Sequence, residues 1–469
     1  MSLRQVVVIV LGVLLNGLNS SMIAVALVPI SATYHVNSQA TAWLVSGLYL
    51  ATSVAQPTMG RLADLLGPKR VFCFGLVLTG LAGLGAWFAP DLGWLIAARV
   101  VLGIGTSAAY PSGLALVRRN ERDGEGIRTS VVLGAITISS QVCTAFGPSV
   151  GGFLITWFGW QSIFLVNVPV TLLGLLGALF WLPGDQQAIR GNLRSVLRSL
   201  DSLGIALFCA MMIALLFFLM RLSSGIAWGP LVIALLAGGL LFWREWRCTT
   251  PFIDIRMLAS HGGLLMTYGR YIATYLVFYS VFYGYSQWLE QGRGLAPDMA
   301  GLVMLPVAAV GALTAALMTK KLVIWRGLLG GALFMLIGTG LLQLAGSTAS
   351  LWLLALIAAV LGIPNGLSNV SNQNALYLQA PASQMGAAAG LLRTSQYVGA
   401  ILASSLISIN YHRQATDAGL HHLGLYLTGV SVLVLIVVLI DPKLRALSDH
   451  LVKKVSTQKG EKEYVRSTR

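Results

Sequence analysis

The sequence predicts an all-α protein that crosses a membrane many times, and three observations lead to this fold class. Hydrophobic residues make up 56% of the 469 residues and charged residues only 10%, whereas soluble domains carry about 25% charged residues. Uncharged apolar runs recur along the whole chain, and a helix needs about 20 such residues to span a bilayer. The 31 Lys and Arg residues fall mainly in short segments between these runs, which indicates membrane topology rather than a nucleic-acid-binding surface.

Fourteen apolar runs are expected to form membrane-spanning helices. Six come first, at 6–28, 42–60, 71–89, 92–117, 129–156 and 161–182. Two follow, at 202–221 and 226–243, and six more lie at 263–288, 299–319, 327–346, 350–376, 385–409 and 423–441. This arrangement predicts an N-terminal six-helix bundle within 1–184, a linker with two extra helices within 185–250, a C-terminal six-helix bundle within 251–442 and a polar tail at 443–469.

The distribution of basic residues predicts the topology. With the N-terminus inside, the inner segments hold 25 Lys and Arg residues and the outer loops hold three, Arg221, Arg293 and Arg413. Cytosolic loops of membrane proteins are enriched in Lys and Arg, so both termini are expected in the cytosol. The first apolar run is too long for a cleaved signal peptide and lacks a clear cleavage site.

The segment Gly60–Arg70, with the sequence G-R-L-A-D-L-L-G-P-K-R, joins the second and third expected spans. Its glycines permit a tight reversal around a single acid. It resembles the loop between helices 2 and 3 of the major facilitator superfamily, although Leu65 and Pro68 stand where that family usually has basic residues. The resemblance implies a gating loop in which Gly60, Asp64, Gly67 and Arg70 take part. The alternative is a basic loop that only fixes topology.

Two further motifs resemble the same superfamily. Arg99–Gly105 reads R-V-V-L-G-I-G and is similar to the family's helix 4 motif, in which Arg99 and Gly103 are the matching functional positions. A charge within a span usually faces protein or water, but the glycines alone would only indicate close helix packing.

On the fifth expected span, Cys143–Gly152 reads C-T-A-F-G-P-S-V-G-G and resembles the motif of exporter branches. The matching positions are Gly147, Pro148, Gly151 and Gly152. A proline in a helix interior predicts a bend, and small residues predict a tight helix crossing. A plain packing kink is the alternative.

Several other segments resemble the fourteen-helix drug/proton antiporter branch. They are Trp43–Pro57, Gly159–Pro169, Asp201-x-x-Gly204, Phe252–Ile255, Gly301–Pro306 and Gly386–Gly399. One departure concerns coupling: where that branch carries an acid on helix 1, this chain has Leu18-Asn19-Ser20-Ser21. An amide cannot exchange a proton, which leaves two routes. Either the carrier is a uniporter or substrate exchanger, or protons pass through another group, for which Glu290, at the outer end of the seventh span, is the candidate.

A central cavity is expected between spans 1, 4, 7 and 10, because polar groups at membrane depth avoid lipid. The candidate cavity residues are Asn19, Ser20, Tyr110, Gln141, Arg270, Tyr271, Tyr275, Asn365, Asn369 and Arg393. Tyr271 and Tyr275 belong to an aromatic stripe that also contains Tyr268, Tyr279 and Phe282, and such a stripe is more often helix packing.

The two arginines are expected to make this cavity electropositive. Arg270 and Arg393 lie at similar depth, and Glu290 is about 30 Å from Arg270 along the helix. No acid within the spans is therefore expected to offset their charge. The alternative is that both side chains extend to the membrane interface.

The resemblance implies the major facilitator fold and a secondary transporter in a bacterial-type cytoplasmic membrane that exports small amphipathic or anionic compounds by alternating access. A facilitator or uptake carrier for an organic anion is an alternative, and a non-transporting membrane scaffold or sensor is another. No enzyme constellation, metal site or cofactor is expected, and the four cysteines lack metal-binding spacing. The expected partners are a small-molecule substrate and the bilayer, without nucleic acid; a monomer is expected, and a periplasmic adaptor stays open.

Overall fold

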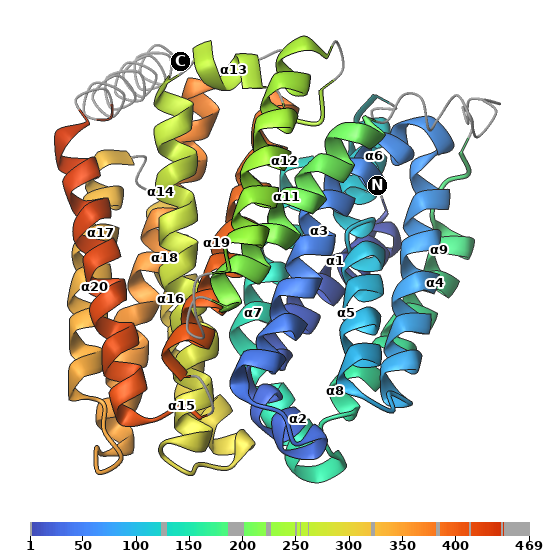
Figure 1. Ribbon diagram of the computed structural model, residues 1–469. Coiled ribbons are helices and arrows are strands. Elements are labelled where there is room, and N and C mark those ends of the chain that lie inside the picture. Colours follow the sequence, from blue (N-terminus) through green and yellow to red (C-terminus); the bar gives the residue numbers. More distant parts are fainter. Residues whose placement is uncertain are drawn as a thin grey trace, which may run out of the picture.

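The computed structural model describes residues 2–122, 129–185, 201–221, 227–248, 251–253, 255–260, 262–319, 324–380, 385–411, 414–441 and 444. Every regular element within these ranges is a helix. The long helices run side by side from the top to the bottom of Figure 1, and these two ends are called the upper and the lower end below. The polar tail at 443–469 lies outside the described residues except Leu444.

The N-terminal half is built from one group of helices. They are α1 (Leu3–Met22), η1 (Ile23–Val25), α2 (Leu27–Tyr34), α3 (Ser38–Leu66), α4 (Pro68–Trp87), α5 (Leu92–Thr106), α6 (Ala109–Arg122), α7 (Thr129–Phe158), α8 (Ser162–Leu165) and α9 (Asn167–Trp181). Helix α1 packs on α7 and α9, while α4 packs on α5 and α9 and α3 packs on α5.

The rest of the chain forms an inserted helix pair and a second group of helices. The pair consists of α11 (Ser202–Arg221) and α12 (Trp228–Arg247). The second group is α13 (Ile255–Ser260), α14 (Gly262–Tyr279), the π-helix η2 (Ser280–Tyr285), α15 (Ser286–Gln291), α16 (Pro297–Thr319), α17 (Ile324–Leu341), η3 (Leu342–Leu344), α18 (Leu351–Gln379), α19 (Met385–Tyr411) and α20 (Asp417–Ile440). Within it, α18 packs on α16 and α17, α20 on α17, and α14 on α19.

All fourteen expected spans fall on these helices, singly or as two or three consecutive ones. Among the described residues, nine stretches are long and apolar enough to cross a membrane. They are Leu3–Val25, Pro68–Trp87, Leu92–Val117, Ser162–Trp181, Ser202–Leu219, Pro297–Met318, Ile324–Leu344, Leu351–Gln379 and Asp417–Ile440. The protein is therefore a multi-pass membrane protein, and the count of fourteen stays a prediction.

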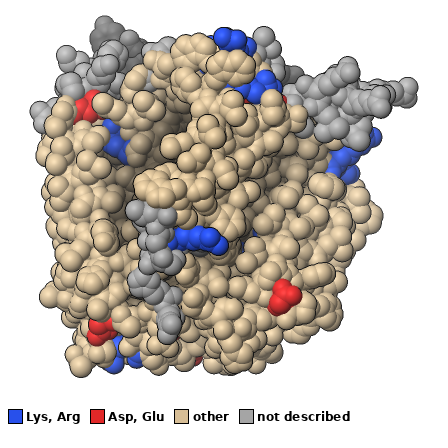
Figure 2. Space-filling view, viewed as in Figure 1, with Lys and Arg blue, Asp and Glu red and all other residues tan. Residues whose placement is uncertain are grey.

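The surface fits a membrane environment. Figure 2 shows a flank made mostly of uncharged residues, with the blue Lys and Arg side chains more numerous toward the upper end. Large apolar side chains that face outward include Phe180, Trp352 and Ile440, which are 79%, 88% and 72% exposed. In water such a surface would be unfavourable, whereas lipid tails solvate it.

The two halves meet along two helix pairs, α3 with α19 and α7 with α16. The inserted helix α11 also contacts both α3 and α19. At the lower end the contact is close enough to involve the backbone. There Ser149 of α7 donates a hydrogen bond to the carbonyl oxygen of Gly301 in α16, at 2.9 Å. The lower end is therefore closed in this structure.

Candidate substrate site between the two halves

The exporter-type motif on α7 forms the closed contact at the lower end. A methyl group at Gly152 would lie 2.3 Å from the carbonyl oxygen of Pro297, and one at Gly301 would lie 2.4 Å from that of Pro148. Gly147 and Gly151 allow α7 to pack closely against α1, because side chains there would collide with Ser21 and Met22. The motif thus lets α7 approach two partners at once, one in each half.

Arg270 corrects the expected charge of the cavity. Its side chain is 2% exposed, and its Nη1 lies 3.2 Å from Oδ2 of Asp441, directly after α20. Its Nη2 donates to Oγ1 of Thr267. The prediction that no acid within the spans offsets Arg270 is wrong, because Asp441, the last residue of the expected span 423–441, forms an ion pair with it. The Arg270 side chain is buried inside the protein and does not reach its surface.

The tyrosines of α14 form a continuous row that η2 extends. Ring centroids are 4.7 Å apart for Tyr271 and Tyr275, 5.6 Å for Tyr275 and Tyr279, and 5.7 Å for Tyr279 and Tyr283. The sequence pattern places Phe282 next in this row, but the π-helix adds a residue to the turn and brings Tyr283 into line instead. The Tyr283 hydroxyl then donates to the Ser20 carbonyl of the other half, at 2.7 Å.

Arg393 of α19 lies where this row meets the N-terminal half. Its guanidinium carbon is 5.4 Å from the ring centre of Tyr110 in α6, a cation–π contact between the halves. Its Nη1 donates to Gln396, and Gln396 donates to the hydroxyl of Tyr279. The ion pairs within the described residues are Arg244–Asp201 and Arg270–Asp441, so Arg393 has no carboxylate partner there.

Further polar groups surround Arg393, and together they form what we call the Arg393 site. Its members are Arg393, Gln396, Tyr110, Tyr271, Tyr275, Tyr279 and Tyr397. Asn369 of α18 accepts a hydrogen bond from Tyr271 at 2.9 Å. Gln56 of α3 accepts one from Tyr397 at 2.6 Å. The site therefore combines one cation, several hydroxyls and aromatic faces, drawn from helices of both halves.

The helix 1 polar residues lie elsewhere. The amide of Asn19 is buried and exchanges hydrogen bonds with the amide of Asn167 in α9. Arg99 donates from Nη1 to the Asn19 carbonyl oxygen and from Nε to the Leu44 carbonyl oxygen. Ser20 donates to the Asn16 carbonyl oxygen of its own helix. Asn19 and Arg99 thus join α1, α3, α5 and α9 within one half. Asn167 belongs to the segment Gly159–Pro169, but its contact with Asn19 was not predicted.

The remaining candidate residues are dispersed. Asn365 lines a small buried cavity of about 10 Å³, together with Thr274 and Pro364. A methyl group at Gly103 would lie 2.7 Å from the Leu48 carbonyl oxygen, so this glycine lets α5 approach α3. The side chain of Gln141 lies outside the described residues. Glu290 in α15 is 8% exposed, and its Oε1 is buried without a hydrogen-bond partner.

The predicted gating loop is the turn between α3 and α4. Gly67 has φ +101°, a conformation that favours glycine. Asp185, after α9, accepts hydrogen bonds from the backbone N–H groups of Lys69 and Arg70 at the start of α4. A methyl group at Gly60 would lie 3.5 Å from Pro111, an ordinary contact. The side chain of Asp64 lies outside the described residues, so its role stays a prediction.

Comparison with known proteins identifies the family. The family model described as Major Facilitator Superfamily matches residues 9–404. The chain belongs to the major facilitator superfamily. As a member of this superfamily it is a transporter of small molecules and not an enzyme.

Individual members of the superfamily are similar in sequence to this chain over most of its length. An uncharacterized MFS-type transporter of Bacillus subtilis, YwoD, is 36% identical over 88% of this chain and 91% of its own length. The methyl viologen resistance protein SmvA of Salmonella typhimurium is 30% identical over 83% of this chain and 78% of its own length. The multidrug efflux pump LfrA of Mycolicibacterium smegmatis is 26% identical over 85% and 79%.

Solved structures share the facilitator fold at low sequence identity. A peptide transporter POT in complex with alafosfalin is 12% identical, with a TM-score of 0.70 over 94% of this chain and 95% of that chain. The nucleoside transporter NupG is 12% identical, with a TM-score of 0.65 over 93% and 98%. At this identity the likeness shows the fold alone.

Proposed function

We propose that this facilitator exports small amphipathic or anionic compounds by alternating access. It would do so from a cytoplasmic membrane, with fourteen spans and both termini in the cytosol. The observation that carries the proposal is the Arg393 site, in which a guanidinium without a carboxylate partner among the described residues lies between the halves. A substrate carboxylate or sulfonate would supply the missing negative charge, and the tyrosine rings would pack against its apolar part.

The contacts of Arg393 support a role that changes during the cycle. Its partner Tyr110 belongs to one half, while Gln396 belongs to its own helix α19. If the halves rotate against each other, the Tyr110 contact breaks and the Gln396 contact remains. A ligand bound at Arg393 would therefore experience a different environment in each state, which is what a ligand needs in order to shift an equilibrium.

The closed lower end supports alternating access. The contact between α7 and α16 rests on glycines and backbone atoms rather than on long side chains. Because few side-chain rotamers are fixed when α7 and α16 come together, the contact costs little side-chain entropy. The two helices can therefore separate as rigid surfaces. Export would require it to open while the upper end closes. The names of SmvA and LfrA, which refer to resistance and efflux, favour this direction over uptake.

Flux in everted membrane vesicles tests the proposal. A growth-inhibition panel with and without expression first selects anionic and cationic amphipathic compounds. We expect vesicles containing the protein to accumulate at least one anionic compound, and Arg393→Gln to abolish that accumulation while Arg4→Gln preserves it. Arg4 is a suitable control because it also stacks on an aromatic ring, that of Trp181, but at the surface of one half.

The alternatives give different results in the same assay. An uptake carrier for an organic anion would accumulate the compound in right-side-out vesicles and would raise, not lower, sensitivity to it. A scaffold or sensor would show no flux with any compound in the panel and no change in tolerance. Either outcome would end the export proposal.

A further inference from the structure

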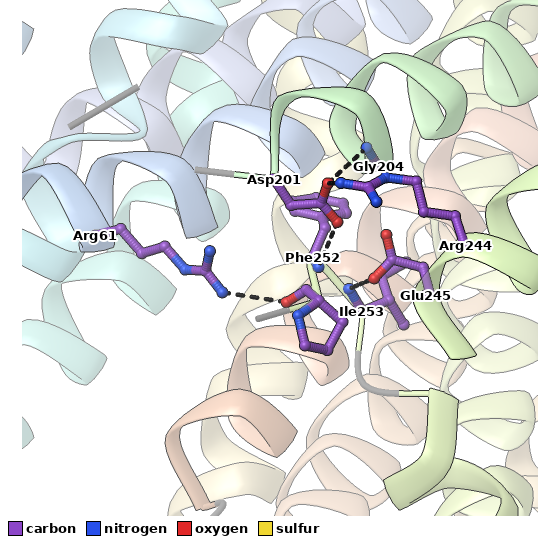
Figure 3. A network of polar contacts seen from close by, with 8 residues as sticks. Arg61, Asp201, Gly204, Arg244, Glu245, Phe252 and Ile253 are labelled. Carbon is purple, nitrogen blue, oxygen red and sulfur yellow. Dashed lines mark hydrogen bonds and ion pairs between the residues drawn. The ribbon is translucent and has the colours of Figure 1, made fainter. Parts of the chain in front are cut away.

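Asp201 and Glu245 form a carboxyl pair at the upper end of the inserted helices, outside the transport site. Asp201 lies one residue before the expected span 202–221, and Glu245 two residues after the expected span 226–243. Figure 3 shows both carboxyl groups turned toward Arg244 and toward the segment 251–253. Their side chains are almost fully buried, since Asp201 is 5% and Glu245 only 1% exposed.

Both carboxyl groups accept hydrogen bonds from backbone N–H groups, and Asp201 also accepts one from a side chain. Oδ1 of Asp201 accepts from the N–H of Gly204 at 3.0 Å, as an N-cap of α11, and from Nη2 of Arg244 at 2.5 Å. Its Oδ2 accepts from the N–H of Phe252 at 3.4 Å. Oε2 of Glu245 accepts from the N–H of Ile253 at 3.1 Å.

Oε1 of Glu245 and Oδ2 of Asp201 both lie close to Gly204. A methyl group at Gly204 would lie 2.2 Å from Oε1 of Glu245 and 2.4 Å from Oδ2 of Asp201. This explains the spacing D-x-x-G, because the aspartate caps the helix and the glycine leaves room for the second carboxyl group. Oε1 of Glu245 is buried and has no hydrogen-bond partner, so a proton on this oxygen would satisfy it by donating to Asp201.

Three other arginines that the structure describes at this end make contacts outside the pair. Arg247 stacks over the ring of Trp243, Arg256 of α13 donates to the Trp246 carbonyl oxygen, and Arg61 of α3 donates to the Pro251 carbonyl oxygen. Among the described residues, Arg244 alone contacts the pair directly, so one described positive charge faces two carboxyl groups. Two carboxylates that share a buried site with one cation favour binding of a single proton.

The protonation equilibria agree with this geometry. Burial raises the pKa of the Glu245 carboxyl to about 7, and neighbouring Asp201 adds to the rise. Burial opposes ionisation of Asp201 too, but hydrogen bonds from Gly204, Glu245 and Arg244 outweigh it and hold its pKa below the usual range. The shared proton therefore resides on Glu245.

The segment 251–253 connects this pair to both halves. The N–H groups of Phe252 and Ile253 donate hydrogen bonds to the carboxyl pair. The carbonyl oxygen of Pro251 accepts one from Nη2 of Arg61, at 3.1 Å. Arg61 belongs to α3 in the N-terminal half, next to the predicted gating loop. On the other side the segment leads into α13 and α14, which open the second half.

We propose that Asp201 and Glu245 bind one shared proton and act as a pH-operated latch on the segment 251–253. With the proton bound, the pair holds the segment against the end of α12 and presents Pro251 to Arg61. With the proton lost, two carboxylates face one arginine, repel each other and release the segment. The latch then loosens the connection between α3 and the start of the second half when the pH at the upper end rises.

The sign follows from the direction of the Glu245 shift. Its pKa in the folded protein lies above the ordinary value of 4.5, so between these values the folded state binds more protons than the unfolded state. Stability contributed by this group is then present at low pH and is lost as the pH rises through about 7.

Hydrogen–deuterium exchange of the full-length protein in nanodiscs tests the latch, because the Phe252 and Ile253 amides are its hydrogen-bond donors. After correction for intrinsic exchange, we expect about tenfold less protection of the 251–253 segment at about pH 8 than at about pH 6. Glu245→Gln, which mimics the protonated group, should keep equal protection at both pH values. Asp91→Asn, which changes the N-cap of α5 at the lower end, should keep the wild-type response.

Infrared spectroscopy of the wild-type protein supplies a measurement that does not depend on folding of a variant. A protonated-carboxyl band should disappear over the pH range in which protection is lost. Equal wild-type protection at both pH values, an unchanged pH response in Glu245→Gln, or absence of the band at about pH 6 would each overturn the proposal. None of these results depends on the substrate or on the direction of transport.

Discussion

The guanidinium of Arg270 forms a buried ion pair with the carboxylate of Asp441, 171 residues further along the chain, with Nη1 and Oδ2 3.2 Å apart. The pair joins the upper part of α14 to the end of α20, and the two side chains are 2% and 5% exposed. It gives Arg270 a role in holding the second half together. Of the two arginines expected in the cavity, Arg393 is the one whose guanidinium contacts the first half.

Removing one partner of this pair should destabilise the protein more than removing both. Arg270→Ala takes the guanidinium away from the buried Asp441 carboxylate. Removing one partner of a buried ion pair costs about 3–5 kcal/mol, whereas apolar replacement of both partners is often neutral. We expect thermal unfolding in detergent to show a large drop for Arg270→Ala and a smaller one for the double variant Arg270→Met with Asp441→Leu. A double variant as unstable as the single one would contradict the assigned role.

Gly152 should be required for closure of the lower end. A methyl group there would lie 2.3 Å from the Pro297 carbonyl oxygen, so Gly152→Ala must push α16 away from α7. We expect this to destabilise the closed state by about 1.4 kcal/mol, which corresponds to a transport rate that is about tenfold lower. The control is Gly429→Ala in α20, where a methyl group would meet nothing within 4 Å and where alanine favours a helix. Equal rates in the two variants would argue against a closing role for the α7 motif.

Composition and motif spacing predicted the helical membrane fold and the family, because long apolar runs and glycines with fixed spacing are local features. The partners of buried polar groups were not predictable in this way. Asn167 and Asp441 meet Asn19 and Arg270 only after the chain has folded. Asn167 lies in the motif-like segment Gly159–Pro169, but such a motif does not say which residue its members contact.

Local backbone irregularity limited the prediction in another place. The aromatic stripe of α14 was expected to continue to Phe282, as an ideal α-helix requires. The π-helix at Ser280–Tyr285 shifts the register, so Tyr283 completes the row and contacts Ser20. The insertion of one residue into a turn has no simple sequence signal, although such π-bulges occur often at functional sites.

Transport should not depend on a titrating group on helix 1. Asn19 cannot exchange a proton, and its amide is paired with Asn167. If a pH gradient drives flux, Glu290 is the proposed coupling group, because it is buried and its Oε1 has no hydrogen-bond partner.

Proteoliposome flux measured with the pH gradient collapsed by an ionophore separates the two routes. Flux that persists down the substrate gradient would indicate a uniporter or exchanger. Strict dependence on the gradient, lost in Glu290→Gln, would indicate coupling through Glu290. Dependence that survives Glu290→Gln would mean that the coupling group lies elsewhere.

Asp64 is predicted to control the gate at the upper end. We expect its carboxylate to lie near the N-terminal end of α19, where a helix dipole favours an anion by about 0.3–1 kcal/mol. Asp64→Asn should therefore impair transport while the protein still reaches the membrane. The control is Asp91→Asn, which replaces the N-cap of α5 at the lower end by another good capping residue. Wild-type flux in Asp64→Asn would count against the prediction.

The central claim is that Arg393 selects anionic substrates between the two halves. The most direct measurement is the ratio of anion flux to methyl viologen flux in proteoliposomes, compared among wild type, Arg393→Gln, Arg393→Lys and the control Arg4→Gln. A hydrogen bond to a charged group contributes about 1.5–3 kcal/mol, so Arg393→Gln should lower the ratio by about tenfold or more. Arg393→Lys should restore it in part, and Arg4→Gln should leave it unchanged. An unchanged ratio in Arg393→Gln, or a wild-type protein that transports methyl viologen and no anion, would contradict the claim.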